Sequence, residues 1–140
     1  MPARERVLDV VREWVAKAEN DLRTAAYVLR LGDVSPTDTT CFHAQQCVEK
    51  YLKALLVLDG IDFPRTHDVG LILSLLSATK RPRLTVEEQR RLTDYATGAR
   101  YPGWPDIPLS EARRAVTIAR RVRREVRRLL PNEVLRTTRR

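Results

Sequence analysis

The chain has 140 residues, of which 43% are hydrophobic and 31% charged, and its formal net charge is +8 at pH 7. This length fits one domain that buries roughly two-thirds of its unfolded surface, and the composition is typical of a globular protein. No apolar run is long enough to span a bilayer, and the N-terminus lacks the pattern of a signal peptide. We therefore expect a cytoplasmic protein without a membrane segment.

Helical periodicity predicts the first two elements. Apolar residues recur at i, i+3, i+4 spacing from Val7 to Leu29, which predicts a helix of about 25 residues. Gly32 and the polar segment after it end this helix and form a linker. A second helix is predicted from a cap at Asp38 or Thr39 to residue 60.

Two further helices follow a loop at residues 61–66. Thr66 can cap a short helix over residues 67–79. Thr85 followed by Glu88 forms a capping box, in which each side chain bonds the other residue's backbone N–H. This box predicts a fourth helix that continues to about residue 99.

The last predicted helix follows a loop over residues 100–108, which contains three prolines and a glycine. Ser110 can cap this helix, and Pro131 ends it. We therefore predict one helical domain over residues 1–131 and a basic tail, residues 132–140, that frays. Since no segment alternates apolar and polar residues as a strand does, the predicted class is all-α: an antiparallel up-and-down bundle of four main helices plus a short one.

The two cysteines are six residues apart on the predicted second helix. Cys41 and Cys47 therefore point about 120° apart around it and cannot form a disulfide. We expect both to be small buried hydrophobic residues in a reducing compartment. The cysteines and histidines lack a familiar ligand spacing, so we expect no metal site and no cofactor.

A polar stripe interrupts the apolar second helix. At about 100° per residue, its members fall within an arc of roughly 80° and are His43, Gln46, Lys50 and Lys53, with Glu49 beside them. The stripe is either the solvent face of an amphipathic helix, supported by i, i+4 pairs, or the lining of a site. Periodicity alone favours the solvent face.

A second candidate lies at FPRTHD, residues 63–68. With Thr66 as the cap, His67 sits in the first helical turn, where free N–H groups and the helix dipole favour an anion. The dipole disfavours imidazolium, so we expect a neutral His67, beside which Arg65 can grip a phosphate or carboxylate. The alternative is an ordinary loop-to-helix junction, with Asp68 complementing the dipole and Arg65 in water.

Two further features are chemically suited to nucleic acid. Arg100, Tyr101 and Trp104 combine a planar cation with two rings, which suits base stacking, although such rings also cover the ends of helical bundles. Eleven arginines against two glutamates lie within residues 112–140, and they leave the remainder of the chain nearly neutral. Such a run is usually a solvated face, yet phosphates or an acidic partner are attracted to it.

Four segments together resemble the HEPN domain family: AENDLRTAAYVL, CFHAQQCVEKYLKALLV, FPRTHDV and RYPG, followed by a helix with spaced alanines. The resemblance runs from about Trp14 to Leu130. It implies a helical bundle that forms a homodimer, a nucleotide-binding role and pairing with a minimal nucleotidyltransferase. It also implies a set of ligand-binding positions: His43, Gln46, Glu49, Lys50, Lys53, Arg65, His67, Arg100 and Tyr101. In this set Lys50, Lys53 and Arg65 hold phosphate, and His43 or His67 bonds the ligand.

Many HEPN proteins are metal-independent ribonucleases, often toxins of toxin–antitoxin pairs, with an Arg followed after four to six residues by a His. That signature is absent, because Arg65 and His67 are too close and no His follows Arg100. We therefore expect a module that binds a nucleotide or nucleic acid without cleaving it. One alternative is a ribonuclease toxin with His67 as base and Arg65 or Arg100 stabilising the phosphorane. Another is a dimeric scaffold that docks an acidic partner on its arginine face.

Overall fold

Six helices make up the part of the chain that the structure, a computed structural model, describes, residues 3–136. No strand occurs within these residues, so the predicted all-α class is confirmed. Three short 3-10 turns connect the helices: η1 Gly32–Val34, η2 Ala78–Lys80 and η3 Gly98–Arg100. The helices are α1 Ala3–Leu29, α2 Thr37–Leu58, α3 Val69–Ser74, α4 Val86–Ala96, α5 Leu109–Arg127 and α6 Asn132–Leu135.

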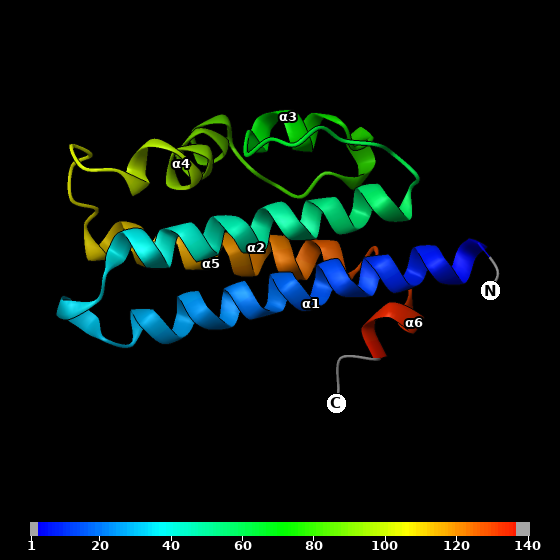
Figure 1. Cartoon of the computed structure of the whole chain (residues 1–140), viewed down its shortest axis with the longest axis horizontal. Coiled ribbons are helices and arrows are strands. Elements are labelled where there is room, and N and C mark those ends of the chain that lie inside the picture. Colours follow the sequence, from blue (N-terminus) through cyan, green and yellow to red (C-terminus); the bar gives the residue numbers. More distant parts are fainter. Residues whose placement is uncertain (1–2, 137–140) are drawn as a thin grey trace.

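Three long helices lie side by side along the molecule (Figure 1). The second, α2, runs opposite to α1, and α5 lies behind α2 and runs in the same direction as it. Helices α3 and α4 cover a further side of α2, and the short α6 lies against α1. Within the described residues, none of the helices combines the length and the apolar character that crossing a membrane requires.

Helix α2 is the centre of the bundle, because α1, α5, α3 and α4 all pack on it. No residue from Thr40 to Asp59 is exposed. Its buried positions include small residues such as Ala44 and Ala54, which let neighbouring helices approach closely. A helix surrounded in this way has no solvent face, so the polar stripe on α2 is not one.

The first residues of α2 and α5 differ from the predicted caps. Helix α2 begins at Thr37, directly after Pro36, and α5 begins at Leu109, directly after Pro108. Both prolines adopt extended backbone at the N-cap position, and neither helix has a side-chain cap. Asp38, Thr39 and Ser110, the predicted caps, therefore lie inside the first turns. Proline sets the chain direction at both starts, and that constraint replaced the polar cap.

Helix α3 begins two residues later than predicted. Asp68 is its cap, and the Asp68 carboxylate accepts a hydrogen bond from Leu71 N at 3.0 Å. The predicted cap, Thr66, instead accepts a hydrogen bond from Asp68 N at 3.1 Å and forms a turn before the helix. Both residue types are good caps, and the choice of Asp68 places His67 outside the helix.

The capping box at the start of α4 is confirmed. Thr85 Oγ1 accepts a hydrogen bond from Glu88 N, and Glu88 Oε1 accepts one from Thr85 N, both at 3.0 Å. The helix ends at Ala96, and the predicted last turn is the 3-10 turn η3.

The chain beyond Pro131 starts with helix α6 rather than with a fraying tail. Val134 in α6 is fully buried, and the guanidinium of Arg12 on α1 donates hydrogen bonds to Glu133 O at 3.3 and 3.4 Å. Residues 132–136 therefore pack with the bundle. The remainder of the predicted tail, residues 137–140, lies outside the described residues.

Cys41 and Cys47 are both free and fully buried, as predicted. Burial raises the pKa of the Cys41 thiol to about 12, and burial raises that of Cys47 as well. Both residues act as small apolar side chains in the core, because a thiol without accessible thiolate is neither a nucleophile nor a ready metal ligand.

Candidate functional site

The polar stripe of α2 divides into two clusters, each built around a buried carboxylate. The first centres on Asp21 of α1, which is only 8% exposed. Its carboxylate accepts hydrogen bonds from His43 Nδ1 at 2.8 Å and from Lys50 Nζ at 2.6 Å. His43 and Lys50 are two helical turns apart, so both lie on the side of α2 that faces α1. We call these three residues the Asp21 cluster.

The second cluster centres on Glu49 of α2, which is 3% exposed. Its carboxylate accepts hydrogen bonds from Lys53 Nζ at 2.8 Å, from His67 Nδ1 at 3.0 Å and from Gln45 Nε2. The Lys53 ammonium also lies 5.6 Å from the ring centroid of Trp14 and 5.5 Å from that of Phe63. We call Glu49, Gln45, Lys53 and His67 the Glu49 cluster.

These contacts change what the stripe residues offer to a ligand. Lys50 and Lys53 are already paired with carboxylates, and the Lys53 side chain is only 12% exposed. Ionised carboxylates only accept hydrogen bonds, so each histidine donates through Nδ1 and keeps Nε2 free. The side chains of His43 and His67 are 29% and 51% exposed. The imidazoles are therefore the most exposed side chains of the two clusters, ahead of Lys50 at 24%.

The two clusters do not form one cleft around a shared ligand. His43 and Glu49 are six residues apart on α2, which separates them by about 9 Å along the axis and about 120° around it. His67 reaches Glu49 from the loop before α3, so it contacts a carboxylate rather than the free N–H groups of a helix start. Arg65 is exposed in the same loop, and Gln46 is half-buried between the clusters along α2.

Arg100, Tyr101 and Trp104 lie at the end of the bundle where α2 begins. The Arg100 guanidinium lies 4.1 Å from the centroid of the Phe42 ring, whose neighbour His43 belongs to the Asp21 cluster. Tyr101 is 67% and Trp104 39% exposed. They line a cavity of about 510 Å³ together with residues 35–38. The structure therefore brings Arg100 near His43, and Arg100 and Tyr101 line one pocket beside the start of α2.

The arginines of α5 fall into two groups. Three are held by the fold: Arg121 pairs with Glu88 at 2.9 Å, Arg123 with Glu19 at 2.7 Å, and Arg127 donates to the hydroxyl of Tyr51 at 3.2 Å. Within residues 3–136, the second group has no carboxylate partner and is exposed; with it we count Arg128, the C-cap residue of α5. Its members are Arg113, Arg114, Arg120, Arg124 and Arg128. These five arginines therefore place positive charge that no contacting carboxylate of residues 3–136 balances on the outer side of α5.

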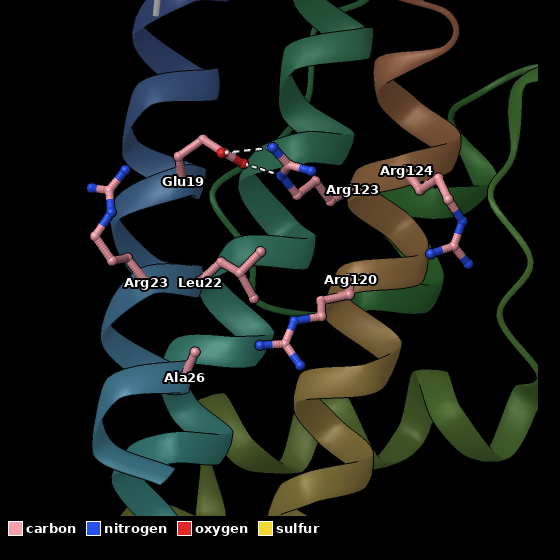
Figure 2. Close-up of a pocket in the computed structure, with 7 residues that line it drawn as sticks. All are labelled: Glu19, Leu22, Arg23, Ala26, Arg120, Arg123 and Arg124. Atoms are coloured by element: carbon pink, nitrogen blue, oxygen red, sulfur yellow. Dashed lines mark hydrogen bonds and ion pairs between the residues drawn. The ribbon is translucent and has the colours of Figure 1, made fainter. Parts of the chain in front are cut away.

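A groove of about 470 Å³ runs between α1 and α5 beside these arginines (Figure 2). Arg120 extends from α5 into the space between the helices, whereas Arg23 and Arg124 project from the outer sides of α1 and α5, away from that space. The groove is lined by Glu19, Leu22, Arg23, Ala26, Arg120, Arg123 and Arg124. Four guanidinium groups against one carboxylate make it strongly positive.

The single carboxylate of the groove belongs to a network that reaches the core. Glu19 accepts two hydrogen bonds from Arg123, at 2.7 and 3.1 Å, and one from the hydroxyl of the fully buried Tyr51. Burial alone raises the pKa of Glu19, but the hydrogen bonds from Arg123 and Tyr51 outweigh it, and the pKa lies below its ordinary value. Glu19 is therefore an anchored anion that fixes Arg123 as one wall of the groove.

The lowered pKa of Glu19 predicts an acid-sensitive contribution to stability. In the unfolded chain Glu19 titrates near 4.5, so its contribution is complete above that pH and is lost as pH falls through the lower folded pKa. We expect Glu19→Gln to lower the free energy of unfolding by about 1–2 kcal/mol at pH 7 and by less at pH 3. Urea unfolding followed by circular dichroism at both pH values measures this. An equal loss at both would contradict the assignment. The pKa values of Glu88 and Glu125 are also lowered, so the stability of the Glu19→Gln variant itself still falls at acid pH. The test is therefore the difference between the two proteins at each pH.

Sequence patterns did not identify three of the residues that organise these sites. Asp21 and Glu19 lie at the two edges of the apolar face of α1, and both are enclosed because α2 and α5 pack against them. Gln45 is fully buried beside Glu49. The neighbouring sequence does not show whether an acid on an amphipathic helix is buried, so only the tertiary structure reveals these partners.

The fold and the clusters define a class of protein: a small all-α bundle whose central helix carries internally paired polar residues. The sequence matches the family described as HEPN domain over residues 11–129. The chain therefore belongs to the HEPN domain family, and the resemblance inferred from the four sequence segments is confirmed.

Similar proteins include one sequence and two solved structures. A Methanocaldococcus jannaschii protein named "Putative toxin MJ1304" is 40% identical over 67 residues, which are 48% of this chain and 42% of that protein. The chain thus spans less than half of that relative. The crystal structure of TT1696 from Thermus thermophilus superposes with a TM-score of 0.69 at 27% identity, covering 86% of this chain and 98% of that one. For ST0689, an archaeal HEPN homologue, the TM-score is 0.64 at 28% identity, with 84% and 94% covered.

Proposed function

We propose that this HEPN protein binds a nucleotide or nucleic acid without cleaving it and acts as the partner of a minimal nucleotidyltransferase in a toxin–antitoxin-like pair. The observation that carries the proposal is the distribution of positive charge. The lysines of the α2 stripe are neutralised by Asp21 and Glu49, whereas five exposed arginines of α5 have no carboxylate partner within residues 3–136. Arginine suits phosphate, because its planar fork can donate two parallel hydrogen bonds to it.

Some residues of the predicted ligand set remain available to a ligand in this proposal, and others chiefly stabilise the bundle. Nε2 of His43 and Nε2 of His67 are free to bond a ligand, and Arg65, Arg100 and Tyr101 are exposed at either end of α2. Gln46 has a buried amide oxygen without a partner among the described residues. Lys50, Lys53 and Glu49 chiefly hold the bundle, because their charges pair within the fold.

Binding is favoured over cleavage by the arrangement of the histidines. A metal-independent ribonuclease needs a base and a cation converging on one phosphate. The family signature that supplies them is absent, and the two histidines belong to clusters on different sides of α2. The name of the M. jannaschii relative supports a role in a toxin-related pair. The homodimer that the family resemblance implies is part of the same proposal.

A salt titration tests the binding function. Fluorescence anisotropy with labelled RNA and calorimetry with ATP and GTP should show binding at low salt that weakens steeply as salt rises. Absence of binding to RNA, DNA and nucleotides at low salt, alone or with the nucleotidyltransferase, would refute the proposal. Low-salt binding to an acidic peptide but to no nucleic acid or nucleotide would indicate the scaffold alternative.

The second candidate is a ribonuclease toxin, and one observation favours it. Glu49 orients His67 through Nδ1, Nε2 is exposed, and Arg65 lies two residues away on the same loop. A carboxylate that orients an imidazole in this way is a common device of general-base catalysis. Expression of the chain alone should then arrest growth and cleave RNA, and His67→Ala should relieve both. Normal growth and intact RNA would remove this candidate.

A further inference from the structure

Three of the five unpaired arginines form a line along α5. At about 100° per residue, Arg113, Arg120 and Arg124 fall within an arc of about 40°. We call these three the arginine row. Along the helix axis, Arg113 and Arg120 are about 10 Å apart, and Arg120 and Arg124 are about 6 Å apart. All three are exposed, and none has a carboxylate partner in residues 3–136.

The row borders the groove between α1 and α5, so its charges act together with those of the groove. Arg120 and Arg124 belong to both. Arg120 extends into the space between the helices, whereas Arg23 and Arg124 project from the outer sides of α1 and α5 (Figure 2). The Arg23 side chain donates only to Asn20, a neutral group, at 3.1 Å. A ligand lying along the groove would therefore meet Arg120 within it and Arg123, fixed by Glu19, beside it, with Arg23 and Arg124 at the outer edges.

We propose that the groove and the arginine row bind the sugar–phosphate backbone of single-stranded nucleic acid, laid along the axis of α5. This inference rests on the proposed function and specifies its ligand class. Arginines one helical turn apart are about as far apart as neighbouring phosphates of an extended strand. Single-strand-binding proteins follow such a backbone with positively charged grooves.

The shape of the site favours one strand over two. A space of about 470 Å³ between two helices admits the backbone of one strand. A duplex is too wide to enter and reaches only the arginines at the outer edges. The groove is lined by arginines, one carboxylate and two aliphatic side chains, with no aromatic ring among them, so bases find no stacking platform there. Binding is therefore independent of base sequence and strongly dependent on salt.

The same lining disfavours an acidic protein as the ligand. Protein interfaces have an apolar, well-packed centre, whereas the apolar part of this groove is limited to Leu22 and Ala26. A polyanion recognised through its backbone needs no such centre, because ion release supplies most of its affinity.

The test is anisotropy with labelled RNA of two, four, eight and twelve nucleotides, and with a duplex of the longest. We expect affinity to rise up to about four nucleotides and then level off, with the duplex bound more weakly. Four phosphate contacts predict a log–log salt slope of about −3, which is about 50-fold between 50 and 200 mM salt.

A matched pair of variants locates the site. Arg120→Glu should weaken binding about tenfold at low salt and reduce the salt slope by about 0.7 to 1.4, since it removes one cation and adds an anion. Arg90→Glu makes the same change of net charge on α4, where Arg90 is 70% exposed, and should change affinity less than twofold. Circular dichroism confirms that both variants are folded.

Several outcomes would overturn the inference. Equal or tighter binding of the duplex, or equal effects of the two variants, contradicts a single-strand site in the groove. Displacement of the bound RNA by polyglutamate at equal charge concentration would assign the groove to an acidic protein. Binding of mononucleotides without oligonucleotides would end this inference and leave the proposed function intact, whereas no binding of either kind would end both.

Discussion

Replacing Glu49 with alanine should lower the free energy of unfolding by about 3–5 kcal/mol, the usual cost of leaving one member of a buried ion pair without its partner. The carboxylate of Glu49 is the acceptor for Lys53, His67 and Gln45. Without the Glu49 carboxylate, the largely buried Lys53 ammonium beside the Trp14 ring loses its hydrogen-bond acceptor. Chemical unfolding in urea at pH 7 measures the loss.

Two comparisons separate this effect from a general loss of charge. Glu87→Ala removes a carboxylate that is 63% exposed and paired with Arg91, so it should cost at most about 1 kcal/mol. The double variant Glu49→Leu/Lys53→Met replaces the buried pair with apolar side chains and should recover most of the stability. A loss below about 1 kcal/mol for Glu49→Ala would show that the cluster does not hold the fold. Unchanged stability with lost nucleotide binding would make Glu49 a ligand residue.

The helices were predictable because each signal for them is local. Periodicity over ten or more residues identifies a helix that buries one face, and the capping box of Thr85 and Glu88 involves only four consecutive residues. The starts of α2, α3 and α5 were less predictable, because several acceptable caps stand close together there. Extended backbone at Pro36 and Pro108 decided two of these starts. The capping bond of Asp68 decided the third.

The candidate site was predictable only as a set of positions on one helix. Periodicity placed His43, Gln46, Lys50 and Lys53 on one arc of the helix, but their partners Asp21 and Glu49 divide them into two clusters. Asp21 comes from another helix, and Glu49 is buried although it lies beside a polar arc. Long-range enclosure of a carboxylate depends on how helices pack, which no sequence spacing records.

Cations in the interior of the bundle are paired with carboxylates, whereas those on the outer side of α5 are not. Cations near α2 are matched by Asp21, Glu49 and Glu19, because an unmatched charge in the interior of the bundle is costly. On the outer side of α5 water solvates the arginines, so no such constraint applies and positive charge can accumulate. The unpaired arginines of α5 therefore place positive charge on a surface where a phosphate backbone can reach it.

The same reasoning makes the apolar half of α2 the most sensitive part of the fold. Leu52 is fully buried in the central helix, so Leu52→Ala should lower the free energy of unfolding by about 2–5 kcal/mol through lost burial and the cavity left behind. Every other long helix packs on α2, so we expect one cooperative transition in urea rather than local opening.

Two variants test whether the loss comes from the cavity and from burial at this position. Leu52→Met keeps the side-chain volume and should cost less than about 1.5 kcal/mol. Leu71→Ala removes the same atoms from α3, where Leu71 is 42% exposed, and should cost less than Leu52→Ala because its surroundings include water. If the two alanine variants were equally destabilised, α2 would not be the centre of the core. If Leu52→Ala unfolded in two steps, α3 and α4 would form a unit that melts apart from α1, α2 and α5.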